Sequence, residues 1–259
     1  NILCAIPLYP PYGTITGIII DMETSLPIEG ALVEVEGTTF SATTLSDGTY
    51  IIENVDIGIY AVSASADNYI SETIPDQTVS NGGTTVVDFE LVPIITQVYD
   101  LETGYQFIST RAQPDNPNML NIVDNLLDNL DFIRNTGGLM VRKIGPVWIN
   151  SIGNWVTTEG YLFKMNSEDQ LAITGIPIDP QTPINLSTGY QIISYLPWQA
   201  LNALDVCENI LDNLDFVRNT GGFMLRKIGP VWINGIGNMN QGEGYLVKMN
   251  APDVLIYPV

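Results

Sequence analysis

The amino-acid sequence predicts a multidomain protein, with an all-β sandwich at residues 13–95 followed by two tandem homologous α+β modules at 96–178 and 179–259. The sandwich is predicted by short segments that alternate apolar and polar residues and are separated by turn residues from position 13 to about 93. The modules are predicted by the stretch 127–150, which recurs almost unchanged at 211–234. The C-terminal part is therefore a tandem duplication.

The duplicated stretch reads LDNLDFIRNTGGLMVRKIGPVWIN in the first copy and LDNLDFVRNTGGFMLRKIGPVWIN in the second. Packing alone tolerates many apolar exchanges and leaves surface positions free to change. Polar positions nevertheless recur, as Arg134 and Arg218 illustrate. Either the duplication is recent, or both copies present the same surface to a partner.

Composition argues against several classes of function. The formal net charge is −20, from 9 Lys and Arg against 29 Asp and Glu, and the chain contains no histidine. Lack of histidine removes the commonest general base and the commonest transition-metal ligand, so we do not expect an enzyme. All positive charges lie after residue 100, and the strongly acidic field repels nucleic acid and anionic lipid headgroups.

Other features of the chain favour an extracellular location. No apolar run is long enough to span a bilayer, and the sequence opens at Asn1 without Met, as either a mature secreted form or a trimmed chain would. Cations outside the cell would screen the self-repulsion of the acidic chain.

The strands expected in the sandwich are TITGIII, ALVEVEG, TYIIENV, IYAVSAS and TTVVDFELV. The residues between and within them resemble the carboxypeptidase regulatory-like family and its relatives, the collagen-adhesin B-type repeats. The matching positions are Gly17, Asp21, Pro27, Gly30, Ala31, Val33, Asp47, Gly48, Tyr50, Val55, Gly58, Tyr60 and Tyr69. The resemblance implies a seven-stranded immunoglobulin-like or transthyretin-like sandwich that serves as a spacer, stalk or accessory domain.

Two details of this resemblance concern single residue types. Asn68 stands where the family usually has glycine, and asparagine tolerates the left-handed backbone conformation. Adhesin relatives often carry a Lys–Asn isopeptide crosslink, but residues 13–95 contain no lysine, so that crosslink is not expected within this domain.

Each repeat is predicted to combine a helix with several strands. In the first copy a strand is expected at 103–110, followed by a helix with Asn116 as cap and Pro117 as first residue. Its apolar stripe consists of Met119, Leu120, Ile122, Val123, Leu126, Leu127 and Leu130. A hairpin and two further strands follow, and the second copy repeats the pattern with a helix around 204–214. The motif G-Y-x-x-I-S, helix, strand pair, I-G-N, G-Y-x-x-K-M resembles repeat modules of secreted bacterial surface proteins.

Residues 1–12 form an apolar arm in which Pro7, Pro10 and Pro11 exclude a helix. Its large aliphatic side chains need a surface to cover them; they are Ile2, Leu3, Ile6 and Leu8. The arm either runs along its own sandwich or docks on a neighbouring subunit as an added strand.

Six basic residues in the repeats are candidates for subunit contacts. They supply most of the positive charge in the chain: Arg134, Arg142, Lys143, Arg218, Arg226 and Lys227. They either pair with the acidic sandwich of a neighbouring subunit or form scattered surface ion pairs of little energy.

The sequence holds candidate residues for two further kinds of ligand site. Trp148 and Trp232 occupy matched places and either stack on sugar rings of a surface glycan or pack in the core. Calcium is the one cation for which the sandwich has candidate ligands, namely Asp21, Glu23, Asp47 and Asp56. A solvated helix face is expected instead for the aspartates of the repeats, which are Asp124, Asp128, Asp131, Asp212 and Asp215.

The two cysteines leave two alternatives. Cys4 and Cys207 form a disulfide in an oxidising compartment, or Cys207 is a buried free thiol, as its alignment with the apolar Val123 favours.

Together these observations predict a non-enzymatic extracellular structural protein. In this interpretation it is a subunit of a surface fibre, filament or surface layer that self-associates through the arm and complementary module surfaces. The alternative is a carbohydrate-binding or host-binding adhesin fragment.

Overall fold

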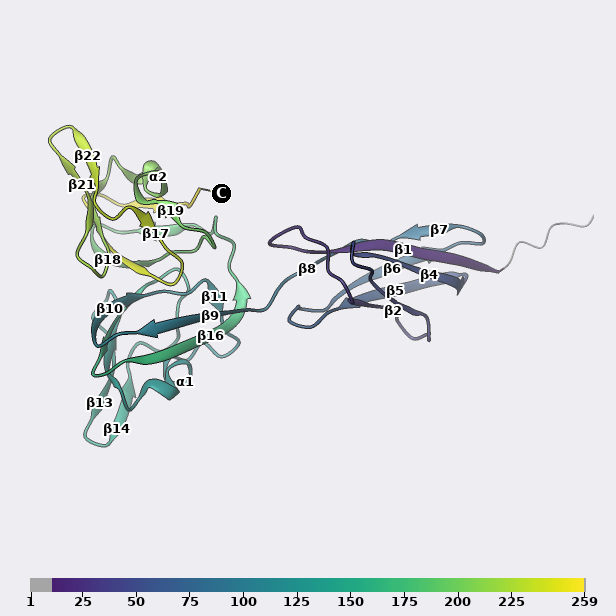
Figure 1. Cartoon of the computed structure of the whole chain (residues 1–259), viewed down its shortest axis with the longest axis horizontal. Coiled ribbons are helices and arrows are strands. Elements are labelled where there is room, and N and C mark those ends of the chain that lie inside the picture. The colour runs from purple at the N-terminus through teal and green to yellow at the C-terminus, as the bar shows by residue number, and fades with distance from the viewer. Residues whose placement is uncertain (1–10, 259) are drawn as a thin grey trace, which may run out of the picture. The chain divides into compact units, whose positions relative to one another are not determined.

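The computed structural model describes residues 11–258. The chain divides into two compact units, a sandwich unit that ends at Ile94 and a repeat unit that begins at Ile95 (Figure 1). No helix within the described range is long and apolar enough to cross a membrane.

The sandwich unit consists of two four-stranded sheets. One has the order β4–β1–β7 with β8 also pairing with β1, and the other has the order β3–β2–β5–β6. The strands are β1 (Tyr12–Asp21), β2 (Leu32–Val35), β3 (Ser41–Thr43), β4 (Thr49–Asp56), β5 (Gly58–Ser65), β6 (Glu72–Val79), β7 (Thr84–Val86) and β8 (Phe89–Leu91). The predicted β-sandwich is confirmed.

Alternation along the strands places one face of each sheet in a shared core. On β2, Val33 and Val35 are buried while Leu32 and Glu34 are exposed. Period-two burial of this kind fixes strand register, because a shift by one residue would exchange the two faces.

A buried carboxylate closes the first strand. Asp21 accepts hydrogen bonds from the backbone amides of Glu23 and Thr24, both at 2.8 Å, and from the Tyr69 hydroxyl, also at 2.8 Å. Burial raises the pKa of Asp21, but the hydrogen bonds from Thr24, Tyr69 and Glu23 outweigh it, so the pKa lies below 3.8. The family motif residues Asp21 and Tyr69 therefore tie two distant parts of the sandwich together.

The repeat unit contains both copies of the duplication. Copy 1 runs from β9 to β16 and copy 2 from β17 to β25. Copy 1 comprises β9 (Ile95–Leu101), β10 (Gly104–Ile108), β11 (Ala112–Gln113), β12 (Leu130–Arg134), β13 (Met140–Ile144), β14 (Val147–Asn150), β15 (Tyr161–Met165) and β16 (Asp169–Pro177). Copy 2 comprises β17 (Ile184–Leu186), β18 (Gly189–Ser194), β19 (Leu201–Asn202), β20 (Leu214–Arg218), β21 (Met224–Ile228), β22 (Val231–Asn234), β23 (Asn238–Met239), β24 (Gly244–Met249) and β25 (Asp253–Leu255).

The main sheets of the two copies have the same topology. Copy 1 has the strand order β10–β15–β12–β13–β14, and copy 2 has the equivalent order β18–β24–β20–β21–β22. A second pairing also recurs, since β9 pairs with β16 in copy 1 and β17 pairs with β25 in copy 2. The duplicated sequence thus specifies one fold twice.

The predicted long helices are wrong, and the copies are nearly all β rather than α+β. Helix α1 spans only Met119–Ile122, is followed by the 3₁₀ turn η1 (Asp124–Leu126), and has Asn118 rather than Asn116 as its N-cap. Copy 2 has α2 (Ala203–Val206) and η2 (Glu208–Ile210).

The helix stops because the chain turns into a strand. Asn129 donates its side-chain amide to Asp169 and accepts the backbone N–H of Asn166, which holds the turn beside β16. The next residue, Leu130, begins β12. The apolar residues that predicted one long helix therefore lie in a short helix, in a 3₁₀ turn and at the start of a buried strand.

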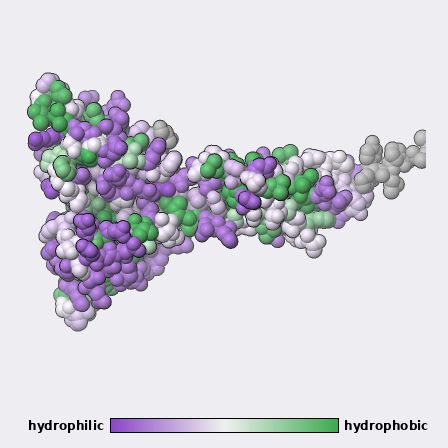
Figure 2. All heavy atoms as spheres, viewed as in Figure 1, coloured by the Kyte–Doolittle hydropathy of each residue, from purple (hydrophilic) through white to green (hydrophobic). Residues whose placement is uncertain are grey.

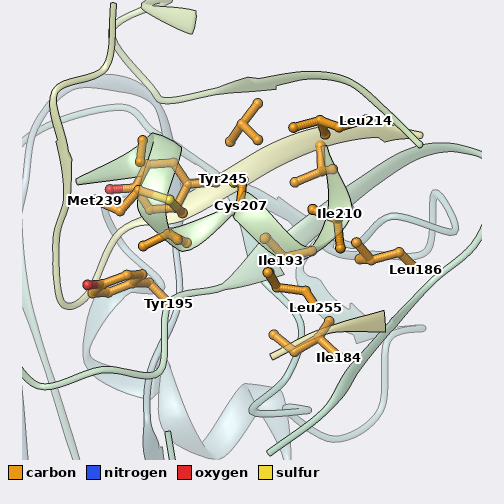
Figure 3. Packing of buried hydrophobic residues seen from close by; sticks show 14 of the residues in the cluster. Ile184, Leu186, Ile193, Tyr195, Cys207, Ile210, Leu214, Met239, Tyr245 and Leu255 are labelled. Carbon is orange, nitrogen blue, oxygen red and sulfur yellow. The ribbon is translucent and has the colours of Figure 1, made fainter. Parts of the chain in front are cut away.

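Cys207 lies in the core of copy 2, where it is a free and fully buried thiol. Figure 3 shows it among Ile210, Met239 and Tyr245. The equivalent Val123 is fully buried in the core of copy 1. Burial raises the pKa of the Cys207 thiol to about 12, so the thiol is protonated at neutral pH. Cys4 lies outside the described residues.

We predict that the Cys207 position tolerates an apolar side chain and resists a polar one. Cys207→Val should change the free energy of unfolding by less than about 1.5 kcal/mol, because copy 1 packs valine at the same place. Cys207→Ser should cost about 1–3 kcal/mol, because it buries a hydroxyl. Urea unfolding of both variants measures the difference, and equal destabilisation would contradict a purely apolar role.

Thiol titration of the denatured, unreduced chain should find both cysteines free. If the titration finds no free thiol, Cys4 and Cys207 are bridged.

The Asp21 carboxylate should stabilise the sandwich at neutral pH. Its folded-state pKa is lowered, so its contribution is present above about pH 4 and is lost as the pH falls through the folded value. Asp21→Asn should lower the free energy of unfolding by about 1.5–3 kcal/mol at pH 7, since hydrogen bonds to a charged acceptor are lost, and by less as the pH falls towards 2. Asp56→Asn at the exposed end of β4 is the control, with an expected effect within about 0.5 kcal/mol. An Asp21→Asn effect that does not vary with pH would contradict this role.

Candidate interaction surfaces

The two copies are joined by a reciprocal pair of hydrogen bonds. Thr136, in the loop between β12 and β13, accepts the backbone N–H of Ile192 on β18 at 2.8 Å. Thr220, in the equivalent loop of copy 2, accepts the backbone N–H of Phe107 on β10, also at 2.8 Å. Each copy therefore reaches across with the same loop and caps the first strand of the main sheet of the other.

Backbone contacts extend this seam. The N–H of Ser109 donates to the carbonyl oxygen of Gly242 at 3.0 Å, and the N–H of Ser194 donates to that of Thr158 at 3.3 Å. A Cβ atom at Gly160 would lie 2.6 Å from the Ile193 carbonyl oxygen, so only glycine permits this approach. The serine and glycine of the repeated motifs thus serve the contact between copies.

An open groove runs along the seam. One part of it, about 250 Å³, is lined by Tyr105, Gln106, Phe107, Leu162, Arg218 and Thr220. The adjoining part, about 240 Å³, is lined by Phe107, Arg134, Asn135, Thr136, Leu162, Tyr190, Gln191, Ile192 and Leu246. Phe107 and Leu162 belong to both parts. We call the whole the seam groove.

The tyrosine of each part of the groove is exposed but fixed in orientation. Tyr105 is 58% exposed, makes an edge contact with Phe132, and has the Lys164 ammonium 5.6 Å from its ring centroid. Lys164 is in turn held by Asp131 at 2.6 Å, which raises the lysine pKa. The Tyr105 ring thus contacts one aromatic neighbour and one lysine that is itself paired with an aspartate.

Copy 2 reproduces this arrangement. Tyr190 is 59% exposed, contacts Phe216 and lies 5.6 Å from the Lys248 ammonium, which pairs with Asp215.

Each copy also extends a hairpin that is apolar and basic at once. In β13–β14, Arg142 and Lys143 are exposed, and so are Ile144 (53%) and Val147 (54%) at the tip. Hairpin β21–β22 repeats these features. The two hairpins lie at opposite ends of the repeat unit in Figure 1, and Figure 2 shows hydrophobic atoms gathered at the tip of β21–β22. A glycine with φ near 60° opens each turn, as primed hairpin turns require.

The six basic residues predicted to make subunit contacts fall in two places. Arg134 and Arg218 line the seam groove, while the other four, Arg142, Lys143, Arg226 and Lys227, lie on the hairpins. The structure, over residues 11–258, shows ion pairs for Lys164 and Lys248 but for none of these six.

The other predicted site residues are placed as follows. Ile2, Leu3, Ile6 and Leu8 lie outside the described residues. Trp148 and Trp232 are half-buried against the core of their own copy, and the Lys227 ammonium lies 6.0 Å from the Trp232 ring centroid. Asp124, Asp128 and Asp212 are exposed, but Asp131 and Asp215 lie on strands and pair with lysines instead of lining a helix face.

The calcium candidates are dispersed and partly engaged. The Asp21 carboxylate accepts hydrogen bonds from two backbone amides and from the Tyr69 hydroxyl. Asp47 accepts hydrogen bonds from the backbone N–H and the hydroxyl of Thr49. Glu23 lies in the turn after β1, and Asp56 ends β4. Across the described part of the chain, no three His, Cys, Asp or Glu side chains gather as a metal site would need.

Sequence reasoning missed the seam and its groove. The available signal was the repetition of Thr136 and Thr220 beside Gly-Gly, together with the serine of each G-Y-x-x-I-S motif. These residues recur because each copy is the partner of the other. The repeat in the sequence suggested only a recent duplication or a surface shared by both copies for a separate partner.

Comparison with solved structures gives only loose superpositions. A cohesin–X–dockerin complex of Acetivibrio cellulolyticus is 31% identical over 30% of this chain and 52% of its own, with a TM-score of 0.26. A proposed carbohydrate-binding protein of Bacteroides uniformis is 14% identical over 95% of this chain and 99% of its own (TM-score 0.28). The minor pilin of Streptococcus agalactiae is 16% identical over 71% and 87% (TM-score 0.27). The chain thus spans about half the length of the first of these structures.

No curated protein matches the sequence. The carboxypeptidase regulatory-like domain model matches residues 14–92, a segment that lies within the sandwich unit. The resemblance inferred from the motif residues is confirmed by this match over residues 14–92.

Proposed function

We propose that this chain is a non-enzymatic extracellular structural protein, a subunit of a surface fibre or surface layer that associates with further copies of itself. The observation that carries the proposal is the uneven placement of positive charge. Residues 1–94 contain 13 acidic residues and no lysine or arginine, while all 9 Lys and Arg lie on the repeat unit together with 16 acidic residues. Unlike surfaces on one subunit form heterologous contacts, which propagate from copy to copy unless the rotation closes them.

The hairpins β13–β14 and β21–β22 suit such contacts. Each offers two cations beside exposed aliphatic side chains, so a partner surface that is acidic and partly apolar would gain both charge pairing and burial. Strand β4 of the sandwich offers such a surface, with Ile51 and Glu53 both exposed on an edge strand. The arm 1–12 would add burial of its aliphatic side chains, at about 1.5–3 kcal/mol for each one fully covered.

A second candidate function is a carbohydrate-binding or host-binding adhesin fragment. The two exposed, rigidly held tyrosines of the seam groove favour it.

Polymerisation should depend on both proposed contacts. Deleting residues 1–10 should abolish polymers seen by electron microscopy and leave the circular dichroism unchanged, because the strands of the sandwich, which begin at Tyr12, are all retained. Changing Arg142, Lys143, Arg226 and Lys227 together to glutamine should also reduce polymer, because the charge pairing is lost, whereas Arg142→Lys with Arg226→Lys, which keeps the charge, should retain it. Assembly through the hairpins should weaken as salt rises from 50 to 500 mM, because salt screens exposed charges.

Three outcomes would separate these contributions or refute them. If polymer is lost only when the arm is removed, the arm makes the contact between subunits and the hairpins do not. If polymer is lost only in the glutamine variant, the hairpins make that contact and the arm does not. A wild-type chain that stays monomeric at millimolar concentration, or variants that all polymerise normally, would overturn the proposal.

A further inference from the structure

The seam groove has the shape of a site for an elongated ligand. Its two parts adjoin at Phe107 and Leu162, and each ends at an exposed tyrosine, Tyr105 on one side and Tyr190 on the other. The equivalent residues of the two copies line it, so its ends offer the same chemistry twice. A ligand built from repeated units fits this arrangement better than a compact one.

Each tyrosine offers a platform for a flat apolar face. The edge contact with a phenylalanine and the lysine beside each ring fix its orientation, so little rotamer entropy is lost when a ligand covers it. Sugar rings present C–H faces that pack on such platforms, while their hydroxyl groups remain in water. The Gln, Asn and Thr side chains along the groove add a polar rim.

Each part of the groove also holds an arginine from the opposite copy. Arg218 lines the part that contains Tyr105, and Arg134 lines the part that contains Tyr190. Neither forms an ion pair within residues 11–258, and the Nε atom of Arg218 is buried with no hydrogen-bond partner there. A guanidinium group binds a carboxylate through two parallel hydrogen bonds, which its terminal N–H groups can supply.

An extended peptide is a poorer fit. Peptides commonly bind an edge strand by adding to its backbone hydrogen bonds. At the groove, however, the N–H groups of Phe107 and Ile192 already donate to the hydroxyls of Thr220 and Thr136. The backbone donors at the centre of the groove are therefore taken, and recognition falls to side chains.

We propose that the seam groove binds an acidic oligosaccharide of the uronic-acid type, with sugar rings on Tyr105 and Tyr190 and sugar carboxylates on Arg218 and Arg134. This ligand names the substrate class for the adhesin candidate above and does not depend on polymer formation. The proposal differs from stacking on Trp148 and Trp232, which lie partly buried against their own cores. Because the groove exists only where the copies meet, neither copy alone would provide the site.

The test is calorimetric titration of the whole chain with trigalacturonate, with cellotriose as the neutral probe. Trigalacturonate should bind and cellotriose should bind at least about tenfold more weakly, since it lacks the carboxylates that pair with arginine. Tyr105→Ala with Tyr190→Ala, and separately Arg134→Gln with Arg218→Gln, should each weaken trigalacturonate binding by about tenfold or more. Both tyrosines are exposed, so their removal should not disturb folding, and circular dichroism and Tm check each variant.

The matched control is Arg142→Gln with Arg226→Gln, which removes the same charge from the hairpins and should change Kd by less than about twofold. Equal losses in the hairpin and groove variants, or equal binding of the two sugars, would overturn the proposal. So would tighter binding of a glutamate tripeptide at the same residues, because that would assign the groove to acidic peptides. Repeating the titration with the chain lacking residues 1–10 separates the two proposals, because loss of polymer should leave sugar binding unchanged.

Discussion

The repeat unit depends on one reciprocal interaction, in which the threonine of each β12–β13-type loop accepts a backbone N–H from the opposite copy. A hydrogen bond of this kind contributes only about 1 kcal/mol net, but an unpaired N–H in its place would cost more. The same two loops also carry Arg134 and Arg218 towards the groove. One contact therefore fixes the relation between the copies and the position of the candidate site.

Close backbone approach makes this interaction feasible. Gly160 and Gly244 stand at equivalent positions where a side chain would meet carbonyl groups of the other copy. Ser109, Thr110 and Ser194 are fully buried at the same place, and the hydroxyl group of each donates a hydrogen bond to a protein oxygen. A pairing of this kind explains why a duplicated chain keeps polar residues that an isolated module would be free to lose.

The sequence was sufficient for some features and insufficient for others. The sandwich was predictable because each strand shows its own period of two, as Val33 and Val35 on β2 illustrate, and because Asp21 and Tyr69 belong to a known motif. The helix length was not, because Leu126 and Leu130 share helical spacing although the chain turns between them, held by the contacts of Asn129. The seam groove was not predictable either, because it joins Tyr105 to Arg218, and no local pattern records which residues of two copies meet. The buried position of Cys207 could be predicted only by reference to Val123 in the other copy.

The most direct test of the seam is native-state hydrogen exchange at the backbone amides of Phe107 and Ile192. Both amides belong to the first strand of a sheet and have their acceptor in the other copy. If the copies form one unit, both amides should be protected and should exchange with the same opening free energy as core amides bonded within a single copy, such as those of Leu126 and Ile210. Exchange of Phe107 and Ile192 at the rate of exposed loop amides, with the two cores still protected, would show that the copies are independent modules and that the seam groove does not persist in solution.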